Sequence, residues 1–322
     1  MPTHAVWKQM LNCLWWSVTA MLCGVPVFAT QNVLHVTSFE LTHDKPFVQV
    51  MVNGKGPYRF IVDTGTAGEA FVSSALADDL HLPVVGAVHL TDPSHQGGQH
   101  VSVVAIETLN VAGVEFKGVR AVRHALSQAD GSCDGLLGFG LFRQYLLTLD
   151  YPHRQLSLSE GAIAQDAGGS VLPFQTPYGI PIISLKISDL EMQAQIDSGG
   201  TGLSIPDAFA SRLKFGMDPT LFGFAESLST RFVLRSAQLA GDVHLGDYVF
   251  SRPFVEIESA FPLANLGSSA MQGFVLTFDQ KHGLVQFVSS EQTHHLGATP
   301  TAVTLEHAPK EELPALALVP VG

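Results

Sequence analysis

The sequence predicts an all-β protein, mainly strands with short helices, built from two similar lobes. In each half of the chain an apolar, strand-like segment runs directly into an Asp followed by a hydroxyl residue and Gly, at 58–65 and again at 192–199. Later in each half, segments 137–150 and 266–279 align with each other without a gap. Like segments in like order indicate two copies of one structural unit, and the alternating patterns favour strands over helices.

The composition supports a folded protein and restricts its partners. Hydrophobic residues make up 46% of the 322 residues and charged residues 14%, a balance that favours a packed core. Lys and Arg total 17 against 29 Asp and Glu, for a net charge of -12, and no stretch concentrates Lys or Arg. Nucleic acid is therefore not expected as a partner.

The first 29 residues predict a secretory signal peptide. Lys8 precedes an apolar core at 14–22, and small or apolar residues end the segment at Val27-Phe28-Ala29. This arrangement is typical of export, so we expect a periplasmic or secreted protein without stable membrane association. Retention of the segment as an anchor stays open as an alternative, although its apolar core is short for a membrane span.

Cleavage after Ala29 would leave one cysteine in the mature chain. Cys13 and Cys23 would be removed with the signal peptide, and Cys133 would remain. One cysteine cannot form an intramolecular disulfide, so stability must come from packing. We interpret Cys133 as a small apolar core residue rather than a nucleophile.

The repeat sets the expected domain boundaries. We expect an N-terminal lobe over 30–158, a linker over 159–170 and a C-terminal lobe over 171–290. The linker is rich in Gly and contains little that would pack, and residues 291–322, rich in Pro, Ala and Thr, predict a poorly ordered tail. Because both copies lie in one chain, a monomer would hold a complete site, and a monomer is expected.

A short helix is expected after each Asp loop. The pattern predicts helices over 72–80 and 205–213, with Ala77 and Ala210 facing inward. Pro206 suits the start of the second helix, because its missing N–H falls where a helix leaves donors unpaired.

The residues Asp-Thr-Gly or Asp-Ser-Gly after a buried strand suit a reactive carboxyl. The strand shields the base of the Asp, the hydroxyl can bond to a partner loop, and Gly lets backbone approach closely. Asp63-Thr64-Gly65 alone would be an ordinary turn sequence. A second such loop, Asp197-Ser198-Gly199, at the matching place in the second copy favours a paired site.

Two lobes related by an approximate two-fold axis would bring Asp63 and Asp197 together. Carboxyls that lie so close share a proton, and the pair titrates as a unit. Such a pair holds one base and one acid, able to take a proton from a bound water and to protonate a departing amide nitrogen. The pattern therefore predicts hydrolysis of peptide bonds without a covalent intermediate.

With these residues, the chain resembles bacterial members of the retropepsin-like and pepsin-like aspartic peptidases, in the single-chain, two-lobed form. The resemblance covers about 36–288 and is strongest over 52–65. It implies a bilobed acid-protease fold of two β-barrel-like lobes with the active site between them. It also implies an aspartic endopeptidase that acts on polypeptides through a water nucleophile, with no cofactor and no metal.

The resemblance also assigns residues. Asp63 and Asp197 match the catalytic carboxyls, Thr64 and Ser198 match the interlocking hydroxyls, and Gly65 and Gly199 complete the two loops. The apolar-Gly pairs that the family packs beside these loops correspond to Leu137-Gly138 and Leu266-Gly267.

The second loop departs from the family pattern. Thr66 supplies a hydroxyl three residues after Asp63, whereas Gly200 at the matching position supplies none. Thr201 is one candidate to replace that hydroxyl.

The flap that the family implies should lie between Val88 and Ile106. We expect its tip near 93–98, where the sequence lacks the Tyr typical of pepsin-like flaps. His95 or His100 could occupy that place, although a His in an exposed loop more often has no such role.

Three other functions compete with this interpretation. A peptide-binding protein that kept the fold and lost turnover is the main alternative, and the two intact Asp residues argue against it. The 14 His prompt a metalloenzyme, but no His-Glu-x-x-His pattern occurs and His294-His295 lie in the tail. A Ser-His-Asp hydrolase lacks a Gly-x-Ser-x-Gly elbow after a strand.

Overall fold

A computed structural model describes residues 33–91, 98–126, 133–164, 168–226 and 231–289. The predicted signal peptide and the predicted tail lie outside these residues. The described residues form mainly strands with a few short helices, so the predicted all-β fold is confirmed.

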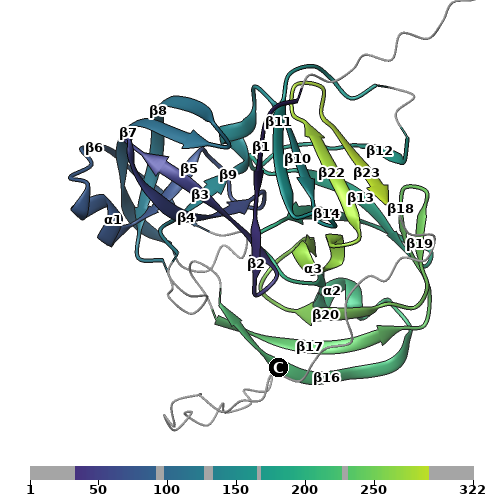
Figure 1. Ribbon diagram of the computed structural model, residues 1–322. Coiled ribbons are helices and arrows are strands. Elements are labelled where there is room, and N and C mark those ends of the chain that lie inside the picture. The colour runs from purple at the N-terminus through teal and green to yellow at the C-terminus, as the bar shows by residue number, and fades with distance from the viewer. Residues whose placement is uncertain (1–32, 92–97, 127–132, 165–167, 227–230, 290–322) are drawn as a thin grey trace, which may run out of the picture. The chain divides into compact units, whose positions relative to one another are not determined.

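An eight-stranded sheet from the first half of the chain carries the first Asp loop (Figure 1). Its strands lie in the order β2 (Glu40–Thr42), β3 (Lys45–Val52), β4 (Lys55–Asp63), β9 (Gly135–Gly138), β5 (Ala70–Ser73), β8 (Val114–His124), β7 (Gln99–Val111) and β6 (Val84–Leu90). Because β3 also pairs with β7, the six strands from β3 to β7 in this order close into a barrel.

A nine-stranded sheet from the second half carries the second Asp loop. Its strands lie in the order β16 (Phe215–Glu226), β17 (Arg231–Leu239), β20 (Phe254–Glu258), β15 (Leu203–Pro206), β21 (Ala264–Gly267), β14 (Leu190–Asp197), β13 (Ile182–Ile187), β18 (Val243–Leu245) and β19 (Tyr248–Phe250). β14 runs parallel to β21 as β4 runs parallel to β9, and β15 runs parallel to β20 as β5 runs parallel to β8. The same pairing pattern therefore occurs in both halves.

A six-stranded sheet joins the two halves. Its order is β1 (Val33–Ser38), β11 (Gln155–Ser159), β10 (Leu146–Asp150), β22 (Phe274–Asp279), β23 (Leu284–Ser289) and β12 (Ser170–Pro173). β10 and β22 are antiparallel, and Thr148 pairs with Thr277, with 3.0 Å between the two hydroxyl oxygens. The segments that align in the sequence thus lie side by side at the centre of this sheet (Figure 1).

The helices are shorter than predicted. α1 spans Ser74–Asp79 and α2 spans Asp207–Ala210, because the residues before them belong to the buried strands β5 and β15. Pro206 is the N-cap residue rather than the first helical residue. Ala77 and Ala210 are buried, as predicted. A 3-10 helix η1 (Phe139–Phe142) and α3 (Ser268–Met271) follow the two apolar-Gly pairs.

The segment expected to be a linker contributes to the core. Ser159 belongs to β11, and Ile163 is buried, with its N–H donating to Asp279 Oδ2 at 3.1 Å. The expectation that little in 159–170 would pack was therefore wrong at Ile163. All the described residues fall within one structural unit, so the boundary between two lobes stays a prediction.

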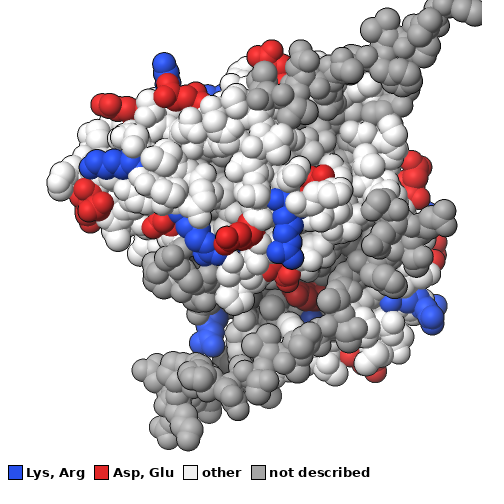
Figure 2. Space-filling view, in the orientation of Figure 1, with Lys and Arg blue, Asp and Glu red and all other residues white. Residues whose placement is uncertain are grey.

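Figure 2 shows that charged side chains are sparse on one face of the molecule, where Lys and Arg lie scattered among Asp and Glu. Among the described residues, no helix has both the length and the apolar character needed to cross a membrane.

Candidate active site

Asp63 and Asp197 end equivalent strands. Asp63 ends β4 beside Gly138 of β9, and Asp197 ends β14 beside Gly267 of β21. The strand residues before each Asp include Val62 and Ile196, which are both fully buried. The apolar part of each strand therefore anchors its Asp at the edge of the core.

The turns after the two apolar-Gly pairs hold the Asp loops through equivalent hydrogen bonds. The N–H of Phe139 donates to the Thr66 carbonyl, and the N–H of Ser268 donates to the Gly200 carbonyl, both at 3.0 Å. The two pairs thus lie beside the loops that the sequence analysis assigned to them.

Thr64 and Ser198 connect the two loops to each other. The Thr64 hydroxyl donates to the Ile196 carbonyl at 2.8 Å and accepts from the Ser198 N–H at 3.0 Å. In the opposite direction, the Ser198 hydroxyl donates to the Val62 carbonyl at 2.7 Å and accepts from the Thr64 N–H at 3.0 Å. The loops are therefore held in register by four reciprocal hydrogen bonds.

Gly65 and Gly199 each lie against the carboxyl of the other loop. A Cβ on Gly65 would lie 2.4 Å from Asp197 Cγ, and one on Gly199 would lie 2.5 Å from Asp63 Cγ. Both separations are shorter than any ordinary contact, so each position requires glycine. The two carboxyls consequently lie together, each enclosed by the backbone of the opposite loop.

The environment of Asp63 favours its protonated form. Its Oδ2 accepts from the Thr66 hydroxyl at 2.8 Å, while its Oδ1 is buried without a hydrogen-bond partner among the described residues. Burial, together with the nearby charge of Asp197, raises the pKa of Asp63 to about 7.

Asp197 receives more donors. Its Oδ1 accepts from the N–H groups of Gly199 and Gly200 at 2.9 Å each, and its Oδ2 accepts from the Asn265 amide at 3.0 Å. Burial raises the pKa of Asp197 too, but these donors oppose the shift. Both Asp residues keep some exposed surface, so the pair is accessible to solvent.

Sequence reasoning missed Asn265 and assigned its role to the wrong candidate. The Thr201 side chain bonds to Glu256 instead of supporting Asp197. The missing hydroxyl at Gly200 is replaced by the Asn265 amide from β21. The available signal was a polar residue in the otherwise apolar segment Ala264–Gly267, where Leu136 occupies the matching place in the first half.

Tyr151 is a second missed residue. It is 3% exposed, and its hydroxyl accepts from the Ser268 hydroxyl at 3.1 Å. Burial raises its pKa, and the charges of Asp197 and Asp63 act in the same direction, which shows that Tyr151 lies near the pair. Tyr151 follows β10 as Gln280 follows β22, so both come one residue after the segments that align in the repeat.

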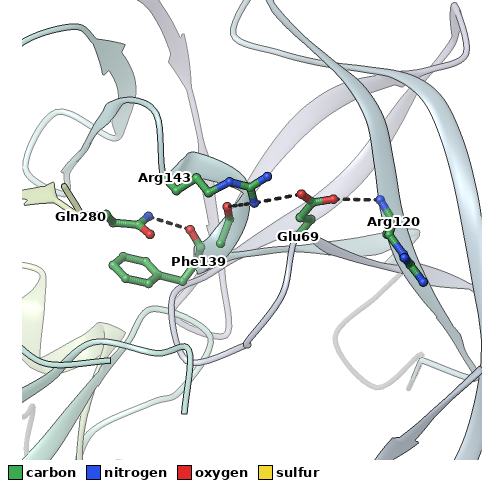
Figure 3. Close-up of polar contacts among 6 residues, drawn as sticks. Glu69, Arg120, Phe139, Arg143 and Gln280 are labelled. Carbon is green, nitrogen blue, oxygen red and sulfur yellow. Dashed lines mark hydrogen bonds and ion pairs between the residues drawn. The ribbon is translucent and has the colours of Figure 1, made fainter. Parts of the chain in front are cut away.

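Further contacts brace the first loop (Figure 3). Glu69, at the end of that loop, accepts from the Arg143 guanidinium and from the Arg120 N–H at 2.9 Å each. Gln280 reaches from the second half of the chain and donates to the Phe139 carbonyl at 2.7 Å. Both halves therefore support the turn beside Asp63.

The predicted flap region forms an antiparallel hairpin of β6 and β7. His100 pairs with His89, and their ring centroids lie 4.8 Å apart. His95 and residues 93–97 of the expected tip lie outside the described residues.

Other predicted features can also be located. Cys133 is buried with Phe47 and Ile61, and its thiol donates to the Gly135 carbonyl at 3.3 Å. In the part of the chain that the structure describes, no three His, Cys, Asp or Glu side chains gather in a group that could hold a metal ion.

Two adjacent carboxyls that share a proton form an acid–base pair able to activate water. Residues 48–141 match the model of a protein family described as aspartyl protease. The matched segment includes Asp63-Thr64-Gly65 and the Leu137-Gly138 pair, and it ends before the second Asp loop. This match supports an aspartyl protease family and protease-like chemistry. No curated protein matches the chain.

Proposed function

We propose that the protein is an aspartic endopeptidase that hydrolyses peptide bonds with a water activated between Asp63 and Asp197. One observation carries the proposal: the reciprocal hydrogen bonds of Thr64 and Ser198 hold the two loops so that each carboxyl lies against the backbone of the other loop. The family match over the first loop supports the same function.

The proposed reaction uses the shared proton. The ionised carboxyl takes a proton from water as the water oxygen bonds to the carbonyl carbon, and the protonated carboxyl gives its proton to the carbonyl oxygen. The carbon–nitrogen bond then breaks as the nitrogen takes a proton from the first carboxyl. The second carboxyl recovers its proton from a hydroxyl of the tetrahedral intermediate, so the pair returns to its starting state.

The test compares the wild type with Asp63→Asn and Asp197→Asn on a denatured protein substrate from about pH 3 to about pH 8. We expect cleavage by the wild type, inhibition by a statine-type compound whose hydroxyl would lie between the carboxyls, and no cleavage by either variant. Circular dichroism checks that both variants fold. Binding of the substrate without cleavage at any pH would instead favour a catalytically inactive peptide-binding protein.

We also propose that the protein is exported and works as a monomer. Export is supported by the sequence pattern of residues 1–29, and the monomer by the presence of both Asp loops in one chain. N-terminal sequencing of the mature protein should begin at Thr30, and light scattering should give the mass of one chain.

A further inference from the structure

The side chains beside Asp63 on β4 are apolar. Ile61 precedes Asp63 by two residues and pairs with Leu136 of β9. Because alternate residues of a strand face the same side of the sheet, Ile61 shares the side of the Asp63 side chain. Ile61 is buried with Phe47 and Cys133, and Leu136 packs against them. Ile61, Leu136 and Phe47 have no polar side-chain atom, and the Cys133 thiol donates to the Gly135 carbonyl.

The matching side chains beside Asp197 are amides. Gln195 precedes Asp197 by two residues and pairs with Asn265 of β21. The Asn265 amide donates to Asp197 Oδ2 at 3.0 Å, and the Gln195 amide makes a longer contact of 3.5 Å with the same oxygen. The equivalent cross-strand pairs are thus apolar in one half and amide in the other.

Gly200 makes room for the Asn265 amide. A Cβ at position 200 would lie 2.6 Å from Asn265 Nδ2 and 2.7 Å from Asp197 Oδ2. In the first loop the matching residue, Thr66, supplies a hydroxyl to Asp63 from within the loop. The second loop obtains its side-chain donor from the neighbouring strand, and this arrangement excludes a side chain at position 200.

We propose that the Gln195–Asn265 amide pair fixes which carboxyl carries the shared proton, so that Asp197 is the ionised base and Asp63 the protonated acid. Hydrogen-bond donors stabilise an ionised carboxyl, and Asp197 has them on both oxygens. The inference rests on the proposed function. Asn265 is a positioning residue, since it contacts Asp197 and acts through it.

Other charged or titratable groups near the pair do not reverse this assignment. Lys45 at the start of β3 favours ionised Asp63, but its effect is the smallest of those on Asp63. Tyr151 is buried with a raised pKa, so its hydroxyl stays neutral. On the side of β20, Glu256 bonds to Thr201, and burial raises the pKa of Glu256.

The test changes the amide side of the site into a copy of the apolar side. Asn265→Leu removes the donor and introduces the residue found at position 136. Gly200→Thr alone should clash with Asn265, whereas the double variant Gly200→Thr/Asn265→Leu should rebuild the Thr66 arrangement. Gln193→Leu is the matched control, because Gln193 is an exposed amide on β14, the strand that ends at Asp197.

The first readout needs no activity. Titration of 13C-labelled Asp carboxyls by NMR, assigned with Asp63→Asn and Asp197→Asn, follows each group directly. We expect Asn265→Leu to move the ionisation of Asp197 upward by about one pH unit, the effect of losing one charge-assisted hydrogen bond. The double variant should return it toward the wild-type position, and Gln193→Leu should leave it unchanged.

The second readout is the pH dependence of kcat. In Asn265→Leu the acidic limb of the kcat profile should move to higher pH together with the Asp197 ionisation. At a pH on the acidic side of that limb, kcat should fall about tenfold with little change in KM. If Asn265→Leu does not fold, Asn265→Ala removes the same donor without added bulk.

The inference is overturned if Asp197 ionises at the wild-type pH in folded Asn265→Leu or Asn265→Ala. It is also overturned if the folded double variant does not return the Asp197 ionisation toward the wild-type pH. A wild type that cleaves nothing contradicts the proposed function alone, because the NMR titration still decides where the proton lies.

Discussion

Thr64 and Ser198 each complete the backbone hydrogen bonding of the other's loop. Each hydroxyl donates to the carbonyl of the residue before the partner's Asp and accepts from the partner's N–H. The two residues are 1% and 0% exposed, so water cannot replace a lost bond. The relative position of the two carboxyls therefore depends on this exchange.

Thr64→Val should destabilise the protein more than the loss of one hydroxyl suggests. It leaves the Ile196 carbonyl and the Ser198 N–H buried without their partner, at an expected cost of about 2–4 kcal/mol in free energy of unfolding. Urea denaturation measures the change. Thr220→Val, at an exposed position of β16, should stay within about 0.5 kcal/mol of the wild type. Equal stability of the two variants would show that the exchange contributes little.

Gly65→Ala should reduce catalysis by displacing the opposite carboxyl. The added methyl would lie 2.4 Å from Asp197 Cγ, so the carboxyl or the loop must move. A misplacement of this size should lower kcat about 100-fold or more. Gly273→Ala is a matched control, because its Cβ would meet nothing within 4 Å. Similar kcat values for the two variants would contradict the close approach of the loops.

The sequence predicted the symmetric part of the site because that part is encoded locally. An apolar strand, an Asp, a hydroxyl residue and Gly follow one another, and the same order recurs, so symmetry alone suggests that the loops meet. The all-β fold followed from the same alternating patterns. The predicted helices began too early in the sequence, because Val72 and Ile205 fit a short helical pattern as well as a buried strand. In the structure both residues belong to strands, β5 and β15, that pair with a neighbouring strand on each side.

The asymmetric part of the site depends on contacts between distant residues. Asn265 lies 68 residues from Asp197, and only the register of β14 with β21 brings its amide to the carboxyl. Thr201 is nearer in sequence, but its side chain bonds to Glu256. Ile163 likewise looks like part of a linker until its contact with Asp279 is known. These contacts between distant residues follow from packing, which a local sequence pattern does not specify.

Phe278→Ala should weaken the core that both halves share. Phe278 is fully buried, 5.4 Å from the Phe139 ring and 6.5 Å from the Phe174 ring between centroids, both in edge-to-face geometry. Its truncation should cost about 3–5 kcal/mol in free energy of unfolding, measured with urea. Phe224→Ala, at a site 47% exposed, should cost less than about 1 kcal/mol. If Phe278→Ala loses little free energy of unfolding, the surrounding core must close around the cavity that the truncated side chain leaves.

The raised pKa of Asp63 predicts that stability falls with rising pH across a defined window. The ordinary pKa of 3.8 applies to the unfolded chain, and burial together with the charge of Asp197 raises the pKa in the folded protein to about 7. Between these values the folded state holds a proton that the unfolded state has released. The free energy of unfolding therefore decreases as pH rises through the window, by at most about 1.4 kcal/mol per pH unit for this proton.

Asp63→Asn removes this contribution, so its stability supplies the reference at each pH. The free energy of unfolding of the wild type minus that of Asp63→Asn should decrease from about pH 4 to about pH 7 and level off above about pH 8. Asp218→Asn, at an exposed carboxyl on β16, controls for the loss of one acidic group. A difference that stays constant or increases with pH would mean that Asp63 is ionised in the folded protein and is not the acid of the pair.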